Sequence, residues 1–364
     1  MKDKIKFIDL FCGCGGITEG LIKYNFELIA GIDNEKPMIE TYNYNFNKKG
    51  IWKDLTQYSP NDLRSTLNID RKSVDVIVGG PPCQGFSLAN MWDKVKNDPR
   101  NTLFYNFVDY VSFFRPRLFL MENVKGILSV QKGKVINAIT KSFEDLGYFI
   151  QKPRVLNAVH YGVPQKRERV FIIGTTKPVS FQWPKESDSI IRVRDAISDL
   201  YGYESKPDES PISYNNGPIS DYQKALRKYS RAVYNHEPRM PALITQEKID
   251  NVEQGGNWMQ IPKEYFPNNR KNRHSSVFKR LHENEPSITI DTGNAHSNYF
   301  HPLYNRIPTV REAARIQSFP DKFIFFGTRT QQYRQVGNAV PPLLAYEISK
   351  SIEKTILRVK NEDY

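Results

Sequence analysis

Near its start the chain reads Lys6-Phe7-Ile8-Asp9-Leu10-Phe11-Cys12-Gly13-Cys14-Gly15-Gly16, an apolar, strand-like run followed by a glycine-rich turn. Helix-type spacing continues over Ile17–Lys23, and a second strand-like run, Glu27–Ile32, ends at Asp33. A strand, a glycine turn, a helix and a second strand in this order predict the first βαβ unit of a parallel sheet.

The same alternation continues through the first half of the chain. Further strands are predicted at Val74–Val78, Leu118–Met121, Phe149–Leu156 and Val170–Thr175, and a helix is predicted at Val135–Leu146. Strands that alternate with helices favour an α/β fold, because each parallel connection needs a crossover. The sequence therefore predicts a doubly wound, mostly parallel sheet.

Beyond residue 178 the character of the chain changes. Pro, Asn, Ser, Tyr and basic residues become frequent and the periodicity weakens, which predicts a second, smaller, loop-rich domain over residues 179–328. Within it a helix is predicted at Thr309–Gln317, where Thr309 and Glu312 form a capping-box pattern. Residues 329–364, with a final helix at Leu343–Val359, are expected to complete the first domain of residues 1–178.

Composition narrows the class of protein. The 364 residues include 52 Lys and Arg against 40 Asp and Glu, and the net charge of +12 permits a polyanionic partner. The three cysteines, Cys12, Cys14 and Cys83, suit neither a disulfide framework nor a zinc site, so no metal is expected. The apolar runs are too short to span a bilayer and the N-terminus lacks a secretion signal, which favours a cytoplasmic location.

Polar residues and glycines follow the ends of five predicted strands. The glycine turn follows the first strand, Asp33 the second, Asp54 the third, Cys83 the fourth and Glu122 the fifth. Ligands of open α/β sheets bind at the carboxyl ends of the strands, so these features predict one composite site. Asp33 lies 20 residues beyond Gly13, a spacing at which an acid can hold a ribose hydroxyl.

Each of these features also has a purely structural interpretation. The glycine turn matches neither the dinucleotide fingerprint nor the phosphate-binding P-loop, and it can be a plain tight turn. Asp33 can cap a helix, and Cys83 can be a small buried residue rather than a nucleophile. Alternate residues of the extended run Gln165–Arg169 would face one side, but a solvated charged edge explains that run as well.

Six motifs together resemble those of the DNA (cytosine-5)-methyltransferases of bacterial and phage restriction-modification systems. The resemblance covers nearly the whole chain apart from its variable middle, and the motifs occur in the family's order. They are Asp9–Gly16, Gly79–Ser87 with Pro82-Cys83-Gln84, Glu122-Asn123-Val124, Gln165–Arg169, Arg311–Pro320 and Gly337–Pro342.

The resemblance implies methyl transfer from S-adenosylmethionine to C5 of a cytosine that is flipped out of duplex DNA. The Cys83 thiolate would attack C6 and form a covalent adduct, and Glu122 would hold and protonate ring N3. Arg167 would contact the base O2 and help to keep Cys83 ionised. Arg169, from the same motif, is a fourth expected catalytic residue.

The resemblance also implies which residues bind the cofactor and the DNA. The expected cofactor residues are Asp9, Phe11, Gly13, Gly15, Gly16, Asp33, Asn34, Asp54, Leu55, Pro82, Leu103 and Asn338. The expected DNA-binding residues are Gln84, Ser87, Arg100, Gln165, Arg270, Arg273, His274, Thr289 and Asn294. The sequence departs from many relatives at Asn34, because an aromatic residue that stacks on adenine often follows the ribose-binding acid.

Double-stranded DNA is the partner that the resemblance implies, with an expected association with the nucleoid. The basic middle segment is expected to select the DNA sequence, and Thr289-Ile290 to anchor its second recognition loop. A monomer would suffice, and a cognate restriction endonuclease that shares the target site is implied. Two alternatives stay open, a tRNA cytosine-5 methyltransferase and a DNA-binding module without activity. Gly85-Phe86-Ser87 favours DNA, because tRNA-modifying relatives carry Pro-Phe-Thr there.

Overall fold

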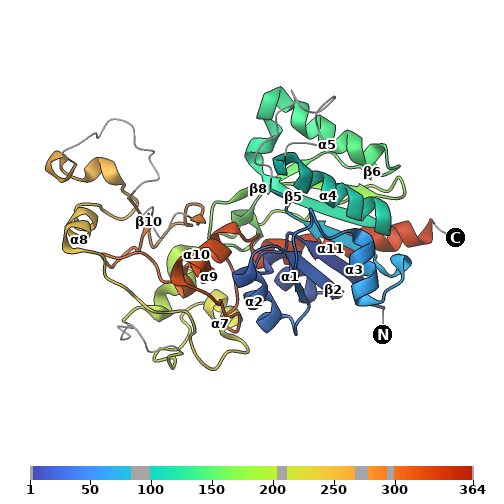
Figure 1. Ribbon diagram of the computed structural model, residues 1–364. Helices are drawn as coiled ribbons and strands as arrows, with labels where there is room; N and C mark the ends of the chain where they lie inside the picture. The colour runs from blue at the N-terminus through green and yellow to red at the C-terminus, as the bar shows by residue number, and fades with distance from the viewer. Residues whose placement is uncertain (1–2, 83–98, 203–210, 267–277, 293–298, 363–364) are drawn as a thin grey trace. The chain divides into compact units, whose positions relative to one another are not determined.

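The computed structural model describes residues 3–82, 99–202, 211–266, 278–292 and 299–362. The chain divides into two compact units (Figure 1). The first unit comprises Met1–Asn157, Glu168–Glu186 and Leu344–Tyr364, and the second comprises Ala158–Arg167 and Ser187–Leu343. These bounds differ from the sequence-based ones, 1–178 plus 329–364 against 179–328. Residues 158–167 and 329–343 group with the second unit, and residues 179–186 group with the first.

The first unit is built on one mixed sheet with the strand order β3-β2-β1-β4-β5-β8-β6, and β7 pairs with β8. Neighbouring strands from β3 to β5 are parallel, whereas β8 is antiparallel to β5, β6 and β7. The predicted α/β fold is confirmed. The strands are β1 Ile5–Leu10, β2 Phe26–Asp33, β3 Gly50–Trp52, β4 Val76–Gly79, β5 Leu118–Val124, β6 Phe149–Ile150, β7 Arg154–Asn157 and β8 Glu168–Thr175.

Helices cover this sheet and bury its apolar side chains. One core cluster joins residues of β1, β2, β4, β5 and β8 to residues of α3, α4 and α5, including Phe107 and Phe143. Figure 1 shows α4 and α5 running alongside the sheet. The helices are α1 Gly16–Ile22, α2 Lys36–Asn45, α3 Pro60–Leu67, α4 Pro99–Phe114, α5 Lys134–Glu144 and α11 Pro342–Asn361, the last of which begins with two residues of the second unit.

Three of the differences between the predicted strands and the structure concern the candidate site or its neighbours. The single strand predicted at Phe149–Leu156 is two short strands, β6 and β7, which are interrupted where Pro153 has no N–H to donate to a ladder. The fourth strand begins at Val76, because Val74 caps a short 3₁₀ turn. The fifth extends to Val124, so Glu122 lies within β5 rather than after it.

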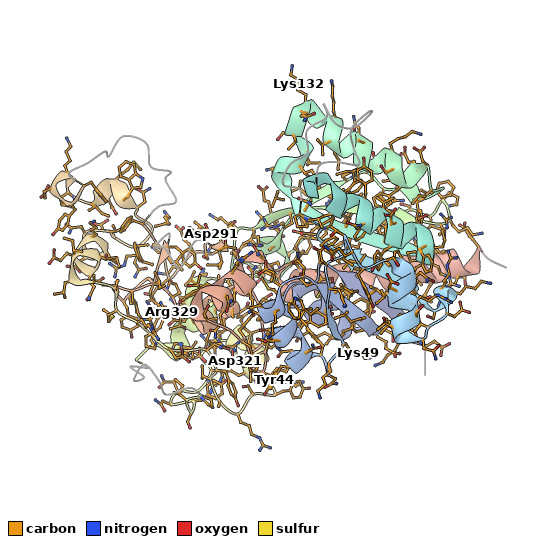
Figure 2. The ribbon with its side chains drawn as sticks, viewed as in Figure 1. Tyr44, Lys49, Lys132, Asp291, Asp321 and Arg329 are labelled. Carbon is orange, nitrogen blue, oxygen red and sulfur yellow. The ribbon has the colours of Figure 1, made fainter. Side chains whose placement is uncertain are left out.

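The second unit is rich in loops, as predicted, and its interior holds buried ion pairs. The Arg315 guanidinium bonds the carboxylates of Asp199 and Asp321, of which Asp321 is labelled in Figure 2, and Arg306 Nη1 lies 2.7 Å from Glu312 Oε2. Such charges are tolerated in an interior only when their hydrogen bonds are satisfied. The elements are α6 Val193–Ile197, α7 Asp221–Arg227, α8 Leu243–Asp250, β9 Lys279–Arg280, β10 Tyr299–Phe300, α9 Val310–Ile316 and α10 Arg329–Asn338.

Two further expectations about helices can be compared with the structure. The capping box predicted at Thr309 is confirmed, because the Thr309 hydroxyl accepts from the Glu312 N–H and the Glu312 carboxylate accepts from the Thr309 N–H. Among the described residues, no helix combines the length and the apolar character needed to cross a bilayer.

Candidate active site

The parallel strands of the first unit end at a common edge of the sheet. Leu10 at the end of β1 is in register with Ile32 of β2 and with Gly79 of β4, and Gly79 is in register with Met121 of β5. The residues that directly follow these positions therefore converge, as predicted for an open α/β sheet. They include the glycine turn, Asp33, Gly80 and Glu122.

The glycine turn is held by the carboxylate of Asp33. The Gly13 N–H donates to Asp33 Oδ2 at 2.9 Å, and the Glu35 N–H donates to Oδ1 at 2.9 Å. Burial raises the pKa of Asp33, while these backbone hydrogen bonds act in the opposite direction. Gly15 has a φ of +99°, and a Cβ there would lie 2.2 Å from the Phe46 ring, so only glycine fits.

Asp9 lies buried near the end of β1, the strand that leads into the glycine turn. The Thr18 hydroxyl donates to Asp9 Oδ2 at 2.7 Å and lies 2.8 Å from the Tyr42 hydroxyl. Within the part of the chain that the structure describes, Asp9 Oδ1 has no hydrogen-bond partner. Burial raises the pKa of Asp9 to about 7, although the Thr18 hydrogen bond lowers it and the charge of Asp33 raises it further.

The raised pKa of Asp9 predicts a specific pH dependence of stability. The folded protein holds this proton up to about pH 7, whereas the unfolded chain loses it near pH 4, so Asp9 favours folding at low pH and this contribution is lost as the pH rises. The unfolding free energy of the wild type minus that of Asp9→Asn should fall by roughly 1.4 kcal/mol per pH unit across this window. Urea unfolding at pH 5 and pH 7.5 measures the difference.

Glu144→Gln, an exposed acid at the end of α5, is the matched control for this titration. Its unfolding free energy should follow that of the wild type at both pH values. A difference between the wild type and Asp9→Asn that stays constant from pH 5 to pH 7.5 would contradict a buried, titrating Asp9.

Trp52 lies beside Asp33 and is absent from the residues that the sequence analysis names. It ends β3 in register with Asp33, its indole N–H donates to the Asn34 carbonyl at 2.9 Å, and 56% of its surface is exposed. Lys36 Nζ lies 5.8 Å from the ring centroid. An aromatic ring is therefore present beside Asp33 despite the asparagine at position 34. In the sequence, Trp52 could have been noticed from its position in the third βα unit, two residues before Asp54.

The remaining predicted cofactor residues of the first unit have varied surroundings. Asp54 Oδ1 accepts hydrogen bonds from the Thr56 N–H and hydroxyl, whereas Leu55 is buried. Phe11 is half-buried with a φ of +56°, a conformation that is costly for a residue other than glycine. Gly16 begins α1, Pro82 is exposed, and Leu103 is half-buried in α4.

Glu122 and Arg169 form an ion pair between neighbouring strands. Arg169 Nε lies 2.9 Å from Glu122 Oε1, and both side chains are more than four-fifths buried. A Cβ on Gly80 would lie 2.8 Å from Glu122 Oε2, so the absence of a side chain there lets the carboxylate lie against the backbone. The Asn123 amide donates to the Pro81 carbonyl at 2.9 Å. Both contacts tie β5 to the segment that leads into Cys83.

Arg167 has different partners from Arg169. It is fully buried in the second unit, where its guanidinium donates to the carbonyls of Ile290 at 2.9 Å and Gly337 at 2.7 Å. Gln165 is also buried there and accepts from the Ile290 N–H at 2.9 Å. The alternative interpretation of this run as a solvated charged edge does not hold for Gln165 and Arg167, because both are fully buried. Arg169 pairs with Glu122 in the first unit.

Two of the predicted residues lie in the second unit at or near its surface. The Thr289 hydroxyl donates to the Lys166 carbonyl at 2.8 Å, and Asn338 is the exposed last residue of α10.

Arg100 falls in the first turn of α4, and the structure describes only its backbone. The predictions that lie outside the described residues are Cys83, Gln84, Ser87, Arg270, Arg273, His274 and Asn294.

Comparison with known proteins identifies the family. The model of the C-5 cytosine-specific DNA methylases matches residues 5–354. The chain is 37% identical to the type II methyltransferase M.DdeI of Desulfomicrobium norvegicum, over 96% of this chain and 88% of that protein. It is 36% identical to the type II methyltransferase M1.HphI of Haemophilus parahaemolyticus, over 96% of this chain and 87% of that protein.

Solved structures agree with these sequence comparisons. A prophage-encoded Escherichia coli protein, assigned as a DNA modification methyltransferase, superposes with a TM-score of 0.74 at 27% identity, covering 97% of this chain and all of that one. The Entamoeba histolytica methyltransferase EhMeth shares the fold, with a TM-score of 0.64 at 16% identity over 97% of this chain and 99% of that one. The chain therefore belongs to the C-5 cytosine-specific DNA methylases and is a DNA (cytosine-5-)-methyltransferase.

Proposed function

We propose that this enzyme transfers a methyl group from S-adenosylmethionine to C5 of a flipped-out cytosine in a specific duplex sequence, through a covalent Cys83 adduct. The observation that carries the proposal is the Glu122–Arg169 pair, 2.9 Å apart, beside the Gly80-Pro81 backbone that leads into Cys83. This pair lies at the edge of the sheet that also bears the glycine turn.

The residues of the sheet edge fit S-adenosylmethionine. Among the described residues, no atom beyond the chain neighbours lies within 4 Å of the position that a Gly13 Cβ would take, and Asp9 Oδ1 lacks a hydrogen-bond partner. Asp33 would hold the ribose, and Phe11 and Trp52 would bind the adenine. When bound, the cofactor would supply an electrophilic methyl group on its sulfonium.

The protein's own side chains would activate the base. C5 of cytosine is a weak nucleophile, so addition of the Cys83 thiolate to C6 is needed to turn the ring into an enamine. Glu122 would protonate N3 as negative charge develops there. Arg169 would orient Glu122, because its guanidinium contacts that carboxylate. Loss of the C5 proton to water then re-forms the C5–C6 double bond and expels Cys83 as a thiolate, and return of the N3 proton to Glu122 restores the enzyme.

Transfer of a radioactive methyl group tests the proposal and its alternatives together. The protein is incubated with tritiated S-adenosylmethionine and either duplex DNA or tRNA, and label is expected in DNA alone. Label in tRNA alone would establish the tRNA alternative, and a protein that shifts DNA without transferring label would be a binding module.

Trp52 predicts a measurable effect on cofactor affinity. Trp52→Ala removes the aromatic surface beside Asp33, and base–aromatic stacking contributes roughly 1–3 kcal/mol, so the Kd for S-adenosylhomocysteine should rise about tenfold. Isothermal titration calorimetry measures the affinity, and quenching of tryptophan fluorescence on binding should weaken in the variant. Trp183→Ala, in the same unit, is the control, and an equal Kd for Trp52→Ala and the wild type would exclude stacking.

The second unit would select the DNA sequence, within a restriction-modification system like those of the named type II relatives. This assignment rests on its loop-rich character and on the basic residues of the middle segment. The enzyme would act as a monomer, with a cognate endonuclease that recognises the same site. Bisulfite sequencing of plasmid DNA from cells that express the protein would reveal which cytosine is methylated.

A further inference from the structure

Two segments far apart in the sequence run side by side in the second unit. Residues 164–167 and the anchored segment, defined here as Ser287–Thr292, are joined by a parallel bridge between Gln165 and Ser287. The Ser287 N–H donates to the Pro164 carbonyl at 2.8 Å, and the Lys166 N–H donates to the Ser287 carbonyl at 2.8 Å. Backbone bonds therefore set the register between the two segments.

Side chains extend this register along the anchored segment. The Gln165 amide accepts from the Ile290 N–H at 2.9 Å, and the Thr289 hydroxyl donates to the Lys166 carbonyl at 2.8 Å. Beyond Ile290 the side chains reach the surface, since Asp291 is half-buried and Thr292 is exposed. Figure 2 labels Asp291 at this end of the anchored segment.

Arg167 and Gly337 both contact the far end of the anchored segment. The buried Arg167 guanidinium bridges the Ile290 and Gly337 carbonyls, so its planar fork joins the segment to α10. A Cβ on Gly337 would lie 2.6 Å from the Asp291 carbonyl and 2.8 Å from the Thr292 nitrogen. Since both contacts are with backbone, α10 and the anchored segment approach closely only because residue 337 is glycine.

We propose that Gln165, Arg167 and Gly337 are positioning residues for DNA sequence recognition. They hold the anchored segment in one register, so that its surface side chains meet the same base pair each time. Reading of a base edge by hydrogen bonds requires donors and acceptors placed to within a few tenths of an ångström, and a loosened anchor costs discrimination first. This inference rests on the proposed function and assigns Arg167 a part in target choice.

Discrimination between duplexes tests the inference. For each variant, kcat/KM is measured on the unmodified duplex that holds the wild-type target sequence and on duplexes that differ from it by one base pair beside the cytosine. The discrimination ratio is kcat/KM on the target duplex divided by kcat/KM on the altered duplex. Arg167→Lys keeps the charge but loses the fork that spans both carbonyls, so the ratio of the two kcat/KM values should fall about tenfold. Gly337→Ala should lower the ratio in the same direction, because its Cβ displaces Asp291.

Two further variants separate anchoring from misfolding and from lost chemistry. Thr289→Val is nearly isosteric and removes only the bond to the Lys166 carbonyl, so it should fold and lower the ratio about threefold. Arg169→Lys should lower kcat/KM on all duplexes in proportion and leave the ratio unchanged. Thermal unfolding reports whether each variant is folded.

The outcomes distinguish this inference from the proposed function. If the wild type methylates DNA and all folded anchor variants keep its ratio, the anchoring role is refuted while the function stands; should Arg167→Lys or Gly337→Ala fail to fold, Thr289→Val decides. A wild type that methylates no duplex would refute the function, and the anchoring role with it.

Discussion

Cys83→Ser should abolish methyl transfer, with a fall in kcat of at least about 10⁴-fold, because a serine hydroxyl at neutral pH cannot supply the anionic nucleophile that a thiolate provides. Binding of S-adenosylhomocysteine should persist, because the proposed role of the Cys83 side chain is to attack the cytosine ring and not to hold the cofactor. Single-turnover transfer of tritiated methyl groups measures the rate, and calorimetry measures the binding. Duplex DNA that contains 5-fluorocytosine should trap a covalent complex of the wild type, with the adduct at Cys83.

The other two cysteines supply the control for this prediction. Cys12 and Cys14 are buried in the glycine turn, and burial raises the pKa of both thiols well above its usual value, so neither supplies a thiolate. Cys14→Ala should therefore still form the trapped complex. Peptide mapping that places the adduct on another residue, or substantial turnover by Cys83→Ser, would refute the assignment of the nucleophile.

Glu122→Gln should lower kcat by about 10²–10⁴-fold, the range expected when a general acid is removed. Glutamine keeps the shape of the side chain and can still accept a hydrogen bond from Arg169 Nε, so the loss would report the missing proton rather than a collapsed pair. Release of tritium from [5-³H]cytosine in DNA follows attack at C6, and it should slow together with methyl transfer.

Glu168→Gln is the matched control for Glu122. Glu168 lies on β8, the strand that also bears Arg169. Its side chain is 45% exposed, and its carboxylate lies 2.9 Å from Lys125 Nζ. Its kcat should stay within a few-fold of the wild type, because a surface ion pair contributes little. Near-normal rates for Glu122→Gln would show that another group protonates the base.

Much of the first unit could be predicted from local patterns. The alternation of strands and helices that begins around Gly13 and Asp33 was sufficient to predict the α/β fold and the sheet edge at which these two residues lie. This works because the hydrophobic period and the glycine turn are local properties that tertiary packing preserves. The same reasoning failed at Phe149–Leu156, where one proline divides an apolar run into two strands.

Partners far apart in the sequence could not be predicted in this way. Alternation along Gln165–Arg169 predicted that these side chains share a face. It could not predict that Arg167 bonds carbonyls 123 and 170 residues further along the chain, or that Arg169 pairs with Glu122. The charges of α9 likewise gave no sign of burial, although Arg315 and Glu312 are fully buried among partners from other segments. A helix or strand pattern reports which side chains share a face, but not what that face packs against.

The sequence by itself determined the class of fold, the family and the order of the chemical motifs along the chain, because each depends on residues that are neighbours in sequence. Only the tertiary structure decided that Arg169 pairs with Glu122, that Trp52 supplies an aromatic ring beside Asp33, and that Gly337 lies against Asp291. Those three contacts arise from strand register and from burial between distant segments, where the pairing of buried polar groups selects each partner.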